Sequence, residues 1–191
     1  GWPHCYFDGA QQKLVLAPEY GGDGKKIGVC ADKKAPVASF PAHWAPNDVL
    51  IYNGKGFPDT WKGGAFIAFH GSWNRAPGPQ GGYNVVYQPM ADGKTTGDYV
   101  IFADGFAGSE KAPGRAEHRP AGLAVGPDGA LYISDDVKGR IWRVTAKGRP
   151  LVKKPKIEGA TTAELLEALK QPEIQKRWAD DLDTCTACAT S

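Results

Sequence analysis

Short apolar runs separated by glycine and proline turns are the feature that most constrains the fold. Four runs come first, and we predict a strand for each: residues 47–53, 64–70, 82–88 and 98–104. The pattern then restarts, and the second set of predicted strands is residues 122–126, 130–134, 140–145 and 150–154. Asn53-Gly54 and Pro127-Asp128-Gly129 are strong turn signals, because proline presets its own φ and glycine accepts positive φ. The pattern therefore predicts an all-β protein.

Two groups of four strands, about 45 residues or more apart, are typical of β-propeller blades. An eight-stranded β-sandwich fits the strand count equally well and stays open as the alternative. The segment GPDGALYISDDVKGRIWRV favours the propeller, because its order of turn, strand, polar corner, glycine and strand resembles one blade. Propellers close with roughly four to eight blades, and this chain has about two to three. We therefore expect a longer protein, or a second chain, to complete the ring.

Net charge and the distribution of apolar residues argue against a nucleic-acid partner and against a membrane span. A net charge of +2 over 191 residues leaves no electrostatic footprint for nucleic acid. No run of about 18 apolar residues occurs, so we predict no membrane span. The first residues, GWPHCYFDG, lack the charged and apolar regions of a signal peptide, which is therefore absent or already removed.

Two of the four cysteines predict a disulfide. Cys5 and Cys30 bracket the glycine-rich stretch EYGGDGKK, and a bond between them would close a loop of about 25 residues. Two buried thiols are the alternative. A disulfide favours an oxidising compartment.

Several segments resemble a known family, over about residues 1–150. The segments are GWPHCYFDG, HWAPNDVLIYNGKGFPDTWKGGAFIAFHGSWNR, GYNVVY and RPAGLAVGPDGALYISDDVKGRIWRV. They are similar to the C-terminal part of the sorbosone dehydrogenase-like proteins, relatives of soluble glucose dehydrogenase and aldose dehydrogenases. The resemblance implies six-bladed propellers that bind pyrroloquinoline quinone (PQQ) and oxidise sugars or sugar aldehydes in the periplasm or outside the cell. Residues 1–155 would then be a partial propeller, with a sugar substrate and an electron acceptor such as a cytochrome as partners.

The chemistry of PQQ selects candidate residues. Its carboxylates need cations, and the planar fork of arginine suits them. The family places a PQQ-contacting arginine at Arg119 in RPAG, and a solvated surface arginine is the alternative. His43 in HWAP matches a position that meets the quinone edge, with a hydrogen-bonded loop histidine as the alternative.

The stretch AFIAFHGSWNR, residues 65–75, ends a buried strand in His70, Trp73 and Arg75. Within a blade, that end would reach the channel of the ring. Histidine suits proton transfer near neutral pH, so we predict His70 as the catalytic base, with a place in the cofactor wall as the alternative. Trp73 would stack against the cofactor, and Arg75 would bind a carboxylate or pair with an acidic loop. Asp135 and Asp136 are expected at a solvated corner, the alternative being that they orient Arg119 or Arg140.

The chain differs from the glucose dehydrogenase relatives in one respect that limits its site. In the glucose dehydrogenase relatives, the catalytic histidine and much of the calcium and quinone shell come from the N-terminal half. This chain is therefore expected to carry an incomplete site, and no calcium ligand is assigned in it. The leading hypothesis is part of a PQQ-dependent sugar or aldehyde dehydrogenase, and the alternative is a non-catalytic propeller that binds or scaffolds.

The chain changes character after residue 155. Thr161 and Glu164 have capping-box spacing, and Pro172 can begin a second helix, so we predict a helical tail over residues 156–191. Family members often continue into a cytochrome c domain, and the tail would be its start or remnant. Cys185 and Cys188 have the haem-attachment spacing, but Ala189 stands where the haem-ligating histidine belongs, which argues against ordinary haem c. A Cys185–Cys188 disulfide, a degenerate remnant of the motif and a misread residue at position 189 stay open.

Overall fold

The computed structural model of this protein describes residues 1–75 and 79–146. By its contacts the chain divides into two compact units, Gly1–Lys153 and Lys154–Ser191, and the described residues all belong to the first. The predicted strand at 150–154, the helical tail and the Cys185 and Cys188 pair lie outside the described residues. In the described part, no helix is long and apolar enough to cross a membrane.

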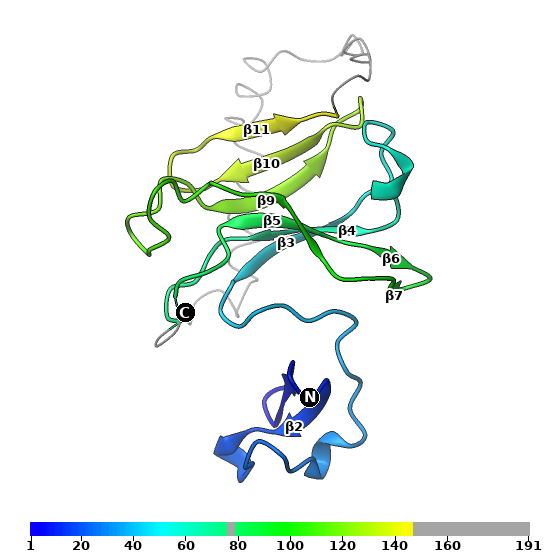
Figure 1. Ribbon diagram of the computed structural model, residues 1–191, viewed down its shortest axis with the longest axis vertical. Coiled ribbons are helices and arrows are strands. Elements are labelled where there is room, and N and C mark those ends of the chain that lie inside the picture. The colour runs from blue at the N-terminus through cyan, green and yellow to red at the C-terminus, as the bar shows by residue number, and fades with distance from the viewer. Residues whose placement is uncertain (76–78, 147–191) are drawn as a thin grey trace, which may run out of the picture. The chain divides into compact units, whose positions relative to one another are not determined.

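The described residues form antiparallel sheets joined by turns and short 3-10 helices (Figure 1). The strands are β1 (Cys5–Asp8), β2 (Lys13–Leu16), β3 (Pro46–Ile51), β4 (Ala65–Phe69), β5 (Asn84–Gln88), β6 (Met90–Ala91), β7 (Lys94–Thr95), β8 (Val100–Ala103), β9 (Pro120–Val125), β10 (Leu131–Asp135) and β11 (Ile141–Val144). The 3-10 helices are η1 (Pro18–Tyr20), η2 (Gly28–Cys30) and η3 (Asp59–Trp61). The predicted all-β class is confirmed for the described residues.

The two predicted groups of strands form two separate sheets. The first has the order β3-β4-β5-β8 and the second the order β11-β10-β9, so each sheet follows the order of the chain. Seven of the predicted strands are therefore confirmed, while the small hairpins β1–β2 and β6–β7 were not predicted. Sandwiches commonly use Greek-key connections, whereas blades are simple meanders, so this order favours blades. No closed ring of sheets occurs among the described strands, and the complete propeller stays a prediction.

Strand β4 is buried along its whole length because both of its faces are covered. Phe66 and Ala68 point into one apolar cluster, whereas Ala65, Ile67 and Phe69 point into another. A strand covered on both faces reads as a continuous apolar run, and this explains the sequence AFIAF.

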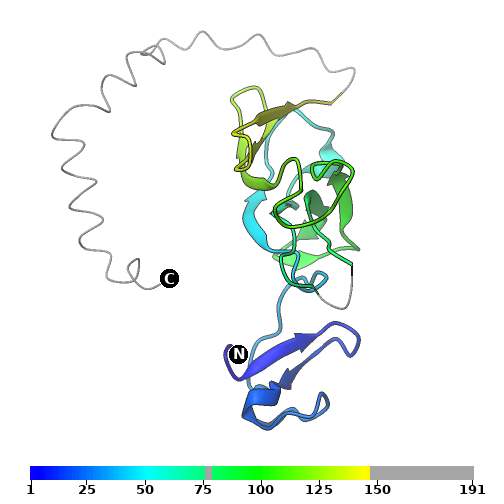
Figure 2. The ribbon, with the colours of Figure 1, turned by 90° about the vertical axis from the view of Figure 1, so that its left-hand side faces the viewer.

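The first of these clusters is shared by the two sheets. It joins Phe66 and Val85 of the four-stranded sheet to Leu131 and Ile133 of β10. Strand β9 accordingly lies beside β3 and β4, as both views show (Figures 1 and 2). Burial of this apolar surface, at about 25 cal/mol per Å², fixes the two sheets against each other.

A buried hydroxyl adds a polar link between the sheets. The Tyr52 hydroxyl donates to the Gly129 carbonyl at 2.6 Å and accepts from the N–H groups of Gly56 and Phe57 at 3.0 and 3.1 Å. Gly56 and Gly129 pack so closely that a Cβ on either would lie within 2.5 Å of the other's backbone. Tyr52 therefore holds the turn before β10 against the loop after β3.

The disulfide-bonded segment at the N-terminus has a small core of its own. Cys5 and Cys30 are bonded, which confirms the predicted disulfide, and they pack with Leu14 and Leu16. The Leu16 N–H donates to the Lys26 carbonyl at 2.8 Å. A cluster this small buries little apolar surface, so the covalent bond carries much of the local stability.

We predict that Tyr52→Phe destabilises the protein by about 1–3 kcal/mol, because it leaves the buried Gly129 carbonyl and two N–H groups without their partner. Tyr87→Phe is the matched control, since the bond that its hydroxyl donates to the Thr60 carbonyl is longer, 3.2 Å. Urea unfolding of the intact protein should show the larger loss for Tyr52. Equal losses would contradict the role of Tyr52 as the link between the sheets.

We also predict that replacing both Cys5 and Cys30 with alanine loosens the N-terminal segment by about 3 kcal/mol. Amide hydrogen exchange measures this change locally. Exchange should speed up in β1 and β2 and stay unchanged in β4 and β5, whose cores do not include the disulfide. Protection that survives in β1 and β2 would show that their hydrogen bonds suffice.

Candidate functional site

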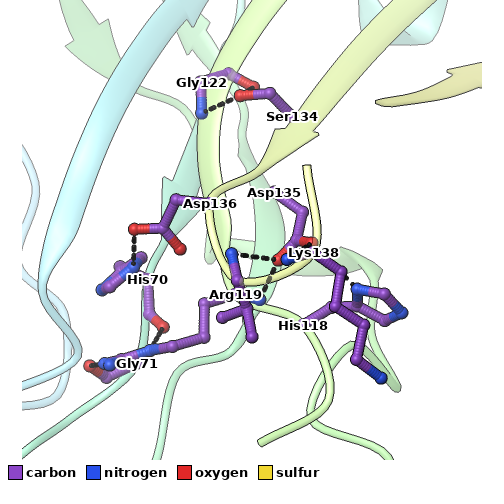
Figure 3. A network of polar contacts seen from close by, with 10 residues as sticks. His70, Gly71, His118, Arg119, Gly122, Ser134, Asp135, Asp136 and Lys138 are labelled. Atoms are coloured by element: carbon purple, nitrogen blue, oxygen red, sulfur yellow. Dashed lines mark hydrogen bonds and ion pairs between the residues drawn. The ribbon is translucent and has the colours of Figure 1, made fainter. Parts of the chain in front are cut away.

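The candidate site lies where β4 ends and β9 begins, at the junction of the two sheets (Figure 3). His70 follows β4 directly, and its Nε2 lies 2.8 Å from the Asp136 Oδ2. Its side chain is 13% exposed, whereas that of Asp136 is 53% exposed. The pair joins residues 66 positions apart in the chain.

Asp135 is the centre of the network. Its buried carboxylate accepts from the Arg119 N–H at 2.7 Å and from the His118 Nδ1 at 2.9 Å. It also accepts from the N–H groups of Val137 and Lys138, at 3.2 and 2.8 Å. One side chain thus ties the start of β9 to the turn that follows β10. The expectation of a solvated corner is wrong for Asp135, because four donors from the fold replace water around it.

These donors also set the charge of Asp135. Burial opposes ionisation, but the hydrogen bonds from the Arg119 N–H, the His118 ring and the Lys138 and Val137 N–H groups outweigh it. The pKa of Asp135 is therefore held well below its usual range. The carboxylate is an acceptor at every one of these contacts.

Arg119 carries the network across to the loop that follows β4. Its Nε donates to the His70 carbonyl at 3.0 Å and its Nη2 to the Gly71 carbonyl at 2.6 Å. The guanidinium lies over the rings of Trp73 and Tyr83, with 4.7 and 5.3 Å from its carbon to the ring centroids. Arg119 is only 4% exposed, whereas Trp73 is 65% exposed. The buried guanidinium of Arg119 therefore supports the loop from inside the protein. The Trp73 indole forms the solvent-exposed surface of that loop.

The loop is closely packed around Gly71 and Tyr83. Gly71 has a φ of +102°, and a Cβ there would lie 2.5 Å from the Tyr83 ring, so only glycine fits. The Tyr83 hydroxyl donates to the Ser72 carbonyl at 2.7 Å. Burial raises the pKa of Tyr83, while the nearby Arg119 charge acts in the opposite direction. Tyr83 therefore remains a neutral hydrogen-bond donor.

Three predicted residues come together in this arrangement: His70, Trp73 and Arg119. The other two are not joined to the network among the described residues. His43 is exposed in the loop before β3 with a φ of +64°, although the neighbouring Trp44 carbonyl accepts from the Gly71 N–H at 3.0 Å. The Arg75 Nη1 donates to the Pro79 carbonyl at 2.6 Å.

Sequence reasoning missed His118 and Tyr83. His118 stands next to Arg119 in the chain, and its ring lies edge-on to Trp142 with the centroids 5.0 Å apart. A useful signal was available in Asp135, which ends a strand and is followed by a turn, a place where a carboxylate often caps N–H groups. Arg140, the other suggested partner of the two aspartates, lies over Trp142 instead.

No group of three or more histidine, cysteine, aspartate or glutamate side chains arranged to hold a metal occurs in the described part of the chain. The candidate site is therefore built from a buried arginine, an exposed indole and an imidazole held by a carboxylate. It can stack on a flat ring and hydrogen-bond to polar groups at the ring's edge.

The fold and this network define an all-β protein with a polar site at the strand ends of two adjoining sheets. A family model described as TrAA12-like matches residues 10–147, and the chain belongs to that family.

The chain is also similar in sequence to two longer proteins. The chain is 30% identical over 176 aligned positions to a pyrroloquinoline quinone-dependent pyranose dehydrogenase of Coprinopsis cinerea, covering 80% of this chain and 23% of that protein. It is 32% identical over 108 positions to an uncharacterized protein of Borreliella burgdorferi, covering 56% of this chain and 27% of that protein. The chain thus spans about a quarter of the length of these relatives.

A solved structure shares the fold. The calcium structure of a Trichoderma reesei family AA12 carbohydrate-active enzyme superposes with a TM-score of 0.56 and 22% identity, covering 74% of this chain and 36% of that one. The iodide structure of the AA12 enzyme gives the same score and identity, with 37% of its chain covered. The finer expectation, a sorbosone dehydrogenase, stays a prediction.

We predict that Asp135→Asn destabilises the intact protein by about 2–4 kcal/mol at pH 7, because the amide cannot accept from all four donors. A lowered folded-state pKa contributes stability above the usual value of 3.8, and that contribution is lost as the pH falls toward the folded-state pKa. The difference from the parent protein should therefore shrink below about pH 4.

Urea unfolding at pH 7 and at pH 3.5 measures both effects. Asp104→Asn is the matched control, since Asp104 is an exposed carboxylate 3.4 Å from the Lys111 Nζ, and exposed pairs contribute about 0–1 kcal/mol. A loss at Asp135 that is no larger than this control, or one that does not change with pH, would contradict the buried-acceptor role.

Proposed function

We propose that this chain is part of a PQQ-dependent sugar dehydrogenase and supplies one wall of its cofactor site. The observation that carries the proposal is the contact of Arg119 with both His70 and Trp73 at the strand ends. Membership of the TrAA12-like family and the similarity to a PQQ-dependent pyranose dehydrogenase support it.

The residues present fit a flat, anionic cofactor. Trp73 offers an exposed aromatic face on which a planar ring can stack. Arg119 has five N–H donors and uses Nε and Nη2 for the two carbonyls, so its edge can still donate to a carboxylate. Because Trp73 and Tyr83 both pack against the guanidinium, a ligand would approach Arg119 at an edge that these rings leave uncovered. His43 and Arg75 would extend this wall from the flanking loops.

When bound, PQQ supplies an ortho-quinone that accepts hydride from the carbon of a sugar or sugar aldehyde. The residues of this chain would orient the cofactor and hold a proton. His70 is the proposed proton acceptor, since an imidazole held by a carboxylate suits that role. Electrons would pass on to a haem protein or a soluble acceptor. Calcium ligands would come from the remainder of the protein.

We further propose that the two sheets are neighbouring blades of a larger ring. Val49, Ile67, Val86 and Ile101 lie side by side across the four-stranded sheet, and Val49 and Ile101 at its two margins are exposed. The centre of this row is already covered, since Ile67 and Val86 are buried, whereas the exposed valine and isoleucine at the two margins suit contacts with further blades. The disulfide supports a periplasmic or secreted location.

The function is tested with the intact protein, supplied with PQQ and calcium. It should bleach dichlorophenolindophenol when given aldoses, and His70→Ala should lower the rate by about 10²–10⁴-fold. His4→Ala is the matched control, because His4 packs against Tyr20 in the disulfide-bonded segment and should leave the rate unchanged.

Two outcomes would overturn the proposal. An intact protein that shows neither a bound-quinone spectrum nor turnover is not a PQQ dehydrogenase, and a non-catalytic propeller that binds or scaffolds becomes the better description. Equal losses in His70→Ala and His4→Ala would remove His70 from the site.

A further inference from the structure

We propose that Asp136 is a positioning residue that holds His70 in the tautomer protonated on Nε2, so that Nδ1 is the nitrogen His70 offers to a ligand. The inference deepens the proposed function and rests on it for the identity of that ligand. The tautomer itself follows from the contacts of described residues, whichever ligand binds.

The main chain of His70 is held on both sides. Its N–H donates to the Ala45 carbonyl at 2.8 Å, and its carbonyl accepts from the Arg119 Nε at 3.0 Å. The next residue is held as well, because the Gly71 carbonyl accepts from Arg119 and its N–H donates to the Trp44 carbonyl. The position from which the imidazole projects is therefore set by two other segments, the loop before β3 and the start of β9.

The ring is then oriented by one contact. Nε2 lies 2.8 Å from the Asp136 Oδ2, and a carboxylate can only accept a hydrogen bond. Nε2 must therefore carry a proton. A neutral imidazole has one N–H group, so Nδ1 is left as the acceptor. Among the described residues, no hydrogen-bond partner faces Nδ1.

Asp136 is itself held in place by its neighbour. The Asp135 carboxylate accepts from the Val137 and Lys138 N–H groups, which fixes the turn in which Asp136 stands. Figure 3 shows Asp136 directed toward His70, while Asp135 is directed toward His118 and the Arg119 N–H. Two adjacent carboxylates thus hold two different histidines.

The pair of His118 and Asp135 provides an internal comparison for the pair of His70 and Asp136. His118 is buried and meets its carboxylate through Nδ1, so the same reasoning places its proton on Nδ1. The two histidines should therefore have opposite tautomers. His118 presents its ring to Trp142 and has a structural role, whereas the His70 side chain stays partly exposed.

Nuclear magnetic resonance tests the tautomers in the intact protein labelled with ¹⁵N-histidine, at alkaline pH. Multiple-bond ¹H–¹⁵N spectra distinguish a protonated from an unprotonated ring nitrogen, and the His70 signals are those lost in His70→Gln. We expect Nε2–H for His70 and Nδ1–H for His118. In Asp136→Ala the His70 signals should shift toward a mixture of tautomers, while those of His118 stay unchanged. A proton on Nδ1 of His70 in the parent protein, or an unaltered tautomer in Asp136→Ala, would overturn the inference.

The affinity for PQQ tests whether Asp136 acts on the cofactor site. It is measured in the presence of calcium, with quenching of tryptophan fluorescence as the signal. Loss of a carboxylate that orients a metal-binding histidine typically costs about 10–100-fold in metal affinity or activity, and by analogy we expect a loss of PQQ affinity at the lower end of this range for Asp136→Ala. Asp136→Glu keeps a carboxylate and should restore most of the affinity. Asp104→Ala removes another exposed, ion-paired carboxylate and should bind PQQ like the parent protein.

These measurements separate the two proposals. If PQQ does not bind to the parent protein, the proposed function fails and the tautomer result stands by itself. If PQQ binds equally to the parent and to Asp136→Ala, the positioning role fails and the proposed function stands. Asp136 is half exposed, so its variants should fold, and an unchanged near-ultraviolet circular dichroism spectrum verifies that they do.

Discussion

The buried carboxylate of Asp135 is the interaction on which the rest of the site depends. It gathers the Arg119 N–H, the His118 ring and the N–H groups of the following turn around one charge. A buried charge is costly unless all its hydrogen bonds are made, so the geometry of these donors is tightly constrained. The side chain of Arg119 then transmits this geometry to the loop of His70 and Gly71. A carboxylate on one sheet therefore determines where a histidine on the other sheet lies.

The distances in this polar network depend on the aromatic core, which holds the two sheets in fixed positions. Phe66 packs against Tyr52, Trp61 and Phe102 with ring centroids 4.7–6.0 Å apart. The same cluster includes Leu131 and Ile133, which lie just before Asp135 in β10. Close-packed interiors resist small displacements, and hydrogen bonds weaken quickly with misalignment. The apolar contacts between the sheets are thus what keep the polar contacts at bonding distance.

The strands were predictable because they depend on local patterns. AFIAF, NVVYQ and LYIS are apolar runs bounded by glycine, proline or polar residues, and each became a strand within a few residues of the predicted range. The hairpin β1–β2 was missed although Asp8 caps its turn by accepting from the Ala10 and Gln11 N–H groups. A four-residue strand beside a disulfide has little periodicity to recognise.

The candidate site was predictable only in part. Residue type and resemblance pointed to His70, Trp73 and Arg119, which do meet, whereas Asp135 and Asp136 were expected at a solvated corner. The local sequence could indicate that Asp135 caps the N–H groups of the following turn, but not that His118 and Arg119, 17 and 16 residues away, also donate to it. The sequence by itself determined the strands of the two larger sheets and their turns, since these depend on near neighbours, and it predicted the bond between Cys5 and Cys30 that the structure contains. Only the tertiary structure decided that Asp135 is buried and that Asp136 meets the Nε2 of His70, because their partners lie in distant parts of the chain that only the packing of the two sheets brings within 3 Å.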